Sequence, residues 1–70
     1  MLEDITIRVN GEPREVQGGL SVDELLRSFD LQPGMIVVER NGDILRRERY
    51  PEVRIAPGDS LELVHFVGGG

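Results

Sequence analysis

The sequence predicts an α+β domain in which about four to five strands form one mixed sheet and one main helix packs on one face. Three observations lead to this fold class. Apolar residues alternate near both ends of the chain as in strands, one segment carries the apolar stripe of a helix, and 70 residues suffice for one domain. Because one helix cannot cover both faces of a sheet, the other face is expected to be solvated or used for binding.

The first two strands are predicted to form a hairpin. Residues 5–9 alternate apolar and polar side chains, which is the period of a strand with one buried face. Asn10-Gly11 readily adopts positive φ and therefore favours a tight turn. The return strand is expected at residues 12–17, with Pro13 at its start or at a sheet edge because proline donates no hydrogen bond to a ladder. Gly18-Gly19 then ends the hairpin.

The next segment predicts the main helix. Ser21 and Glu24 have the spacing of a capping box, in which each side chain accepts from a backbone N–H that the helix leaves free. Apolar side chains at helical spacing form a single stripe of Val22, Leu25, Leu26 and Phe29. Pro33-Gly34 stops the helix within one turn of Asp30, so its predicted length is about two to three turns.

The second half of the chain supplies the remaining predicted strands. Residues 35–38 are an unbroken apolar run, as expected of a strand that is covered on both faces. The following elements are, in order, a turn at 39–42, a short strand at 43–45, an exposed charged loop at 46–52, a short edge strand at 53–55, a turn at 56–59 and a last strand at 60–67.

The composition excludes several classes of function. Without cysteine there is no disulfide, thiolate zinc site or cysteine nucleophile, and without lysine there is no Schiff-base chemistry. A net charge of −5 argues against binding nucleic acid or an anionic membrane and favours a partner with a basic docking face. The start at residues 1–4 is acidic and no apolar run approaches the length of a membrane span, so we expect a cytoplasmic protein.

Side-chain chemistry is sparse. His65 lies in a predicted strand with no neighbouring nucleophile to activate, and we interpret it as a half-exposed strand residue rather than a general base. Glu3-Asp4 is interpreted as a solvated terminus and Asp23-Glu24 as helix capping, so neither predicts a metal or carboxylate-dyad site. The arginines within 46–52 could hold a phosphate, but the interleaved glutamates favour a self-neutralised loop. We therefore expect no enzyme, no metal and no bound cofactor.

The end of the chain is its most unusual feature. Residues 1–67 are predicted to form the domain, and Gly68, Gly69 and Gly70 a flexible tail. Residues without Cβ make the slimmest and most flexible peptide arm, which in extended form reaches about 10 Å. Such an arm can place the Gly70 carboxylate in the active site of another protein. The alternative is an inert, frayed terminus.

The last strand suggests where a partner would dock. Leu61 and Leu63 share one face and are expected to face the helix, whereas Val64 and Phe66 share the other. Val64 and Phe66, together with Val67, are therefore the predicted partner-binding residues beside the tail. In the alternative, Val64 and Phe66 are tucked under the charged loop.

These residues resemble the ThiS family, the sulfur carriers of thiamin thiazole biosynthesis, which have the small ubiquitin-like β-grasp fold. The resemblance covers essentially the whole chain. It is strongest at Val38-Glu39-Arg40-Asn41-Gly42, Arg49-Tyr50, Gly58-Asp59 and Val64-His65-Phe66-Val67-Gly68-Gly69-Gly70. The terminal motif is the most specific of these.

The resemblance implies a carrier cycle for a protein substrate that is monomeric when free. A ThiF-like activating enzyme would use ATP to adenylate the Gly70 carboxylate, with Gly68 and Gly69 as the arm. A persulfide donor protein would displace AMP and leave a thiocarboxylate, whose sulfur the thiazole synthase ThiG would incorporate. Two alternatives remain: a carrier like the small subunit of molybdopterin synthase, and a noncovalent ubiquitin-like interaction module whose tail is inert.

Overall fold

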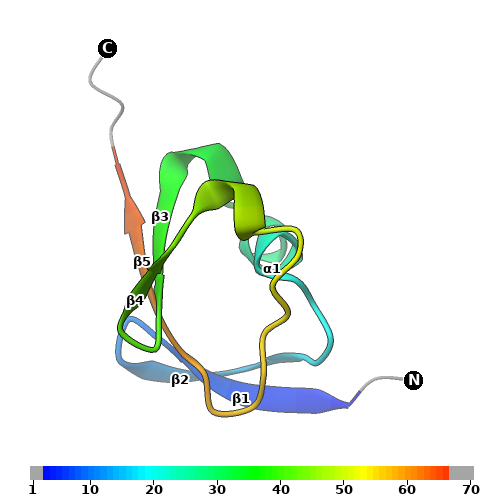
Figure 1. Cartoon of the computed structure of the whole chain (residues 1–70). Helices are drawn as coiled ribbons and strands as arrows, with labels where there is room; N and C mark the ends of the chain where they lie inside the picture. Colours follow the sequence, from blue (N-terminus) through cyan, green and yellow to red (C-terminus); the bar gives the residue numbers. More distant parts are fainter. Residues whose placement is uncertain (1–2, 67–70) are drawn as a thin grey trace.

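The computed structural model describes residues 3–66, which form one five-stranded sheet with one α-helix across its inner face (Figure 1). The elements are β1 (Asp4–Val9), β2 (Glu12–Gln17), α1 (Val22–Ser28), the 3₁₀ turn η1 (Pro33–Met35), β3 (Ile36–Arg40), β4 (Asp43–Leu45), the 3₁₀ turn η2 (Arg47–Arg49) and β5 (Ser60–His65). The strand order is β2-β1-β5-β3-β4, in which β1 and β5 are parallel and the other neighbours are antiparallel. The predicted α+β class and mixed sheet are confirmed.

Two asparagine–glycine turns set the register of the two hairpins. Asn10 and Gly11 have φ of 52° and 84°, and Asn41 and Gly42 have φ of 51° and 90°. Positive φ at both central residues gives the turn whose twist matches that of paired strands. The predicted first hairpin is therefore confirmed, with Pro13 on the edge strand β2 and paired with Arg8 of β1.

Helix α1 begins at the predicted capping box. The Glu24 backbone N–H donates to Ser21 Oγ over 3.0 Å, and the Ser21 N–H donates to Glu24 Oε1 over 2.8 Å. The helix ends at Ser28, two turns later, with Phe29 as its C-cap and Asp30 in the left-handed region at φ 62°. Its length agrees with the prediction, and its apolar stripe packs on the inner face of the sheet.

The core lies between α1 and the inner face of the sheet. Its buried members come from both halves of the chain: Ile7, Val9, Val22, Leu25, Leu26, Ile36, Val38, Tyr50, Ile55 and Leu61. The helices found between residues 3 and 66 are all too short or too polar to span a bilayer.

The prediction that residues 46–52 form an exposed loop is wrong for Tyr50. The turn η2 carries Tyr50 into the core, where the residue is only 2% exposed. Its hydroxyl donates to the Ile36 carbonyl over 2.7 Å, so the one polar atom of the ring is satisfied in the interior. Burial raises the pKa of the Tyr50 hydroxyl, and the backbone of Val38 and the nearby charge of Arg47 partly offset that rise.

Three further expectations need correction. The run at residues 35–38 is not covered on both faces: Ile36 and Val38 are buried but Val37 is half-buried, because only one face has a helix. The expected strand at residues 53–55 reduces to a single bridge between Arg54 and Ser21. The last strand ends at His65 rather than at 67, and residues 67–70 lie outside the described part of the chain.

The buried carboxylate of Asp59 ties the β3–β4 turn to the start of β5. It accepts from Arg40 Nε at 3.0 Å, Asn41 Nδ2 at 3.1 Å and the Ala56 N–H at 2.8 Å. Burial alone raises the pKa of Asp59, but these hydrogen bonds and the charge of Arg40 together hold it below its ordinary value. Two of the motifs that carry the family resemblance, Arg40-Asn41 and Gly58-Asp59, thus lie together in one hydrogen-bonded cluster.

Candidate functional site

The outer face of the sheet, opposite α1, presents exposed apolar side chains on β4 and at the end of β5. The register pairs Val64 of β5 with Val37 of β3, and Ile44 of β4 with Glu39 of β3, so these side chains point away from the helix. Ile44 is 65% exposed, Val64 58% and Phe66 38%. We call these three the outer apolar residues; half-buried Val37 lies beside Val64.

The backbone of Phe66 is still anchored to the fold. Its N–H donates to the Met35 carbonyl over 3.1 Å, which continues the β3–β5 pairing by one residue. The predicted tail residues Gly68, Gly69 and Gly70, and Val67 before them, lie outside the described residues. Their roles therefore remain predictions.

The charged loop touches the outer face without covering it. The guanidinium carbon of Arg47 lies 5.9 Å from the centroid of the Phe66 ring, a cation–π contact. Phe66 is thus partly shielded, while Val64 stays open. Both residues point away from the helix, as their alternation with Leu61 and Leu63 predicts, and their part in docking remains a prediction.

Two of the three arginines in the loop are paired with acids. Arg46 contacts Glu48 at 3.7 Å and Arg49 contacts Glu52 at 3.4 Å. Within residues 3–66, Arg47 has no carboxylate within 4.0 Å. The loop is therefore self-neutralised except at the guanidinium that rests on Phe66.

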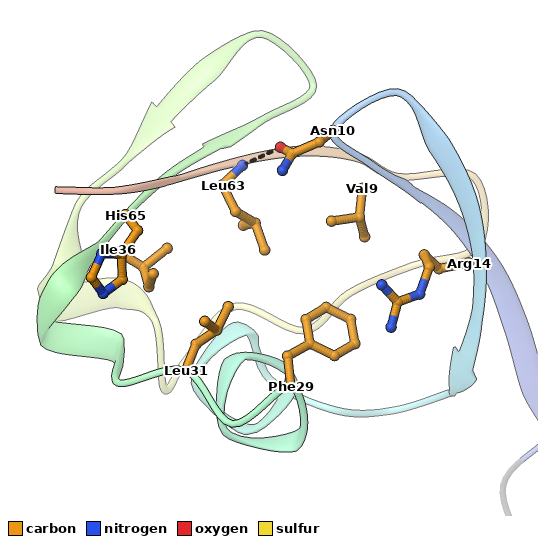
Figure 2. Close-up of a pocket in the computed structure, with 8 residues that line it drawn as sticks. All are labelled: Val9, Asn10, Arg14, Phe29, Leu31, Ile36, Leu63 and His65. Carbon is orange, nitrogen blue, oxygen red and sulfur yellow. Dashed lines mark hydrogen bonds between the residues drawn. The ribbon is translucent and has the colours of Figure 1, made fainter.

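A groove of about 370 Å³ opens on the other side of the molecule, between the C-terminal end of α1 and the inner face of the sheet (Figure 2). It is lined by Val9, Asn10, Arg14, Phe29, Leu31, Ile36, Leu63 and His65. The Arg14 guanidinium carbon lies 4.5 Å from the centroid of the Phe29 ring. We call this the helix-side groove.

The histidine and the acidic pair of α1, which the sequence offered as weak candidates for chemistry, occupy positions that the fold itself explains. His65 is exposed at the end of β5 and lines the helix-side groove. Glu24 caps α1, and Asp23 accepts from Arg27 at 2.9 Å. Among residues 3–66, no group of three histidine, cysteine or acidic residues is placed to hold a metal ion.

Sequence reasoning missed Ile44 and the helix-side groove. Ile44 could have been found, because the two-residue turn pairs Arg40 with Asp43 and so sets Ile44 opposite Glu39 on the outer face. The groove had no local signal, since its lining comes from four separate stretches of the chain.

Comparison with known sequences gives one consistent family. The model of the ThiS family matches residues 7–70. The chain is 46% identical over 50 residues to the sulfur carrier protein ThiS of Bacillus subtilis, covering 71% of this chain and 76% of that protein. It is also 38% identical over 64 residues to a thiazole synthase of Magnetococcus marinus, covering 91% of this chain but only 20% of that protein.

Solved structures agree with the fold. The crystal structure of the thiamine biosynthesis protein ThiS from Geobacter metallireducens matches with a TM-score of 0.80 at 38% identity, covering 94% of this chain and 100% of that one. A computationally designed protein based on human erythrocytic ubiquitin matches with a TM-score of 0.55 at 25% identity, covering 99% and 98%. The predicted ubiquitin-like fold is confirmed.

Proposed function

The chain belongs to the ThiS family, and we propose from this that Gly70 carries sulfur as a C-terminal thiocarboxylate for the thiazole ring of thiamine. As a ThiS protein it is a sulfur carrier of thiamine biosynthesis and not itself a catalyst. One observation carries the finer proposal: the family match extends through Gly70 in a chain that has no cysteine. A covalently held sulfur therefore has no side-chain thiol to occupy.

The proposed cycle begins with activation. A Gly70 carboxylate oxygen attacks the α-phosphorus of ATP in a ThiF-like activating enzyme, which releases pyrophosphate and leaves an acyl adenylate. The terminal sulfur of a persulfide on a donor protein then attacks the acyl carbon, and AMP leaves. A thiol reduces the S–S bond of the resulting acyl disulfide, so that a protein disulfide forms and the thiocarboxylate remains on Gly70. Gly68 and Gly69 serve as the arm that enters each active site.

Thiazole synthase is the proposed acceptor of the sulfur. A segment similar to this chain makes up about a fifth of two proteins that carry that name, one of them 38% and the other 37% identical to it. A carrier-like segment within the same polypeptide as the synthase supports direct transfer between the two. The molybdopterin-type alternative lacks this support. We place the protein in the cytoplasm, where ATP is available to the activating partner.

Docking is proposed to use the outer face. Val64 and Phe66 expose apolar area beside the point where the chain leaves the described residues, and Arg47 adds one cation over Phe66. Ile44 adds exposed apolar area on the same face, farther from that point and level with Glu62 of β5. Aromatic and arginine side chains are the residue types that most often dominate binding energy at an interface. Val67 is included in this proposed surface as the residue that follows.

The test is alkylation and intact-mass measurement after incubation with an activating enzyme, ATP and a sulfur donor. Because the chain has no cysteine, an alkylated thiocarboxylate has little background. We expect one adduct that maps to Gly70, and none in a variant lacking Gly69 and Gly70. Absence of an adduct, with an activating enzyme shown to act on another carrier, would favour the noncovalent interaction module. Alkylation is needed because oxidation of Met1 or Met35 nearly matches an oxygen-to-sulfur exchange in mass.

A further inference from the structure

We infer that the helix-side groove is a second binding site, one that takes a small organic acid with its anionic group on Arg14 and its apolar body along Phe29 and Leu63. The site lies on the opposite side of the sheet from the outer apolar residues. It is independent of the thiocarboxylate chemistry proposed for Gly70.

The Arg14 guanidinium is available to an anion. Five of the other arginines contact a carboxylate within 4.0 Å: Arg27, Arg40, Arg46, Arg49 and Arg54. Across residues 3–66, Arg14 has no such partner and no side-chain hydrogen bond. Its guanidinium carbon lies 4.5 Å from the centroid of the Phe29 ring, a contact that uses none of its N–H groups as hydrogen-bond donors to a carboxylate, so they can serve a bidentate acceptor.

The neighbouring polar group is oriented to assist. Asn10 Oδ1 accepts from the Leu63 N–H over 2.8 Å, which fixes the side-chain amide. Its nitrogen is thereby turned toward the groove, on the same side as the Arg14 nitrogens (Figure 2). The groove lining therefore includes two side-chain N–H donors, those of Asn10 and Arg14.

The rest of the lining selects an apolar body. Five of its residues are apolar, namely Val9, Phe29, Leu31, Ile36 and Leu63, and none is acidic. Although the chain has a net charge of −5, no acidic side chain of the lining competes with an anion for Arg14. His65 stands at the far end from Arg14 and offers one further polar contact (Figure 2).

The volume decides between a small molecule and a larger occupant. A groove of about 370 Å³ lies at the lower end of the range of small-molecule sites, about 300–1,000 Å³. It accommodates one ring with a short acidic chain, whereas an extended peptide would bury much more area. The inferred ligand class is thus an aryl or branched-alkyl carboxylate or sulfonate.

The test uses 4-phenylbutyrate as the probe in an amide chemical-shift titration of the full chain. We expect saturable shifts centred on Asn10, Phe29, Leu63 and His65. The uncharged analogue 4-phenylbutan-1-ol should bind at least tenfold more weakly, because it cannot pair with the guanidinium. Equal binding of the acid and the alcohol, or shifts centred on Ile44 and Val64 instead, would overturn the inference.

A pair of variants separates the groove from overall charge. Arg14→Gln should weaken binding of the acid at least tenfold. Arg8→Gln removes the same charge from the adjacent strand, where Arg8 pairs with Pro13 and its side chain points to the outer face, and it should change binding less than twofold. Equal effects of the two variants would contradict a specific site. Because no activating enzyme is present, the outcome is independent of the Gly70 proposal.

Discussion

Leu61 and Val64 lie three residues apart on β5 but have opposite surroundings. Leu61 is 0% exposed against α1, whereas Val64 is 58% exposed on the outer face. Both are aliphatic and both come from the same strand, so their difference arises from the single helix, which covers one face only. The inner face stabilises the fold, and the outer face keeps apolar area free at little expected cost to stability. The following predictions test that division.

The largest effect is expected on the inner face. Leu61→Ala leaves a cavity beneath α1 in a fully buried position and should lower the free energy of unfolding by about 2–5 kcal/mol. Urea unfolding followed by circular dichroism measures it. Val64→Ala is the matched control, and its effect should stay within about 0.5 kcal/mol. Comparable losses in the two variants would mean that the faces are not energetically distinct.

A buried carboxylate sharpens the comparison through pH. Asp59 is held in its charged form by Arg40, Asn41 and the Ala56 N–H, so its folded pKa is lower than its ordinary value of 3.8. The stability from this shift is fully present above the ordinary value and is lost as the pH falls below it toward the folded pKa.

Asp59→Asn should therefore cost about 1.5–3 kcal/mol at pH 7, since hydrogen bonds to a charged group are lost. The variant should also lose part of the destabilisation by acid that we expect of the parent chain. Urea unfolding at pH 7 and pH 3 measures both. An unchanged difference between the two pH values would show that other carboxylates dominate.

The Tyr50 hydroxyl offers a smaller test of the inner face. Tyr50→Phe keeps the buried ring but removes the donor to the Ile36 carbonyl, leaving that oxygen unsatisfied. We expect a loss of about 1–2 kcal/mol by urea unfolding. A neutral result would indicate that water replaces the hydroxyl.

The residues that sequence reasoning placed correctly are those with local signals. The Asn10-Gly11 turn and the Ser21–Glu24 capping box act within a few residues, so their geometry follows from neighbouring sequence. The charged neighbours of Tyr50 predict an exposed loop, whereas in the fold the residue joins the core and its hydroxyl bonds the carbonyl of Ile36, fourteen residues earlier along the chain.

The candidate sites divide in the same way. Alternation along β5 was sufficient to place Val64 and Phe66 on the face away from the helix. The helix-side groove was not predictable, because Arg14 and Phe29 meet only when β2 and the end of α1 are brought together by the fold. Long-range packing thus accounts for what local patterns missed.

A small effect on stability is also expected at Phe66, where the two faces should differ most in function. Phe66→Ser removes an exposed ring that lies outside the buried core, so the free energy of unfolding should change by less than about 1 kcal/mol. Binding to a ThiF-like or thiazole synthase partner should weaken more than tenfold, because a central aromatic contact is lost. Calorimetric titration and urea unfolding on the same variant compare the binding affinity and the free energy of unfolding.

Arg46→Gln is the control, because Arg46 lies next to Arg47 in the charged loop but is paired with Glu48, and it should alter neither quantity. If Phe66→Ser reduced stability and binding by equal free energies, Phe66 would belong to the core, and the division of β5 into a folding face and a docking face would fail.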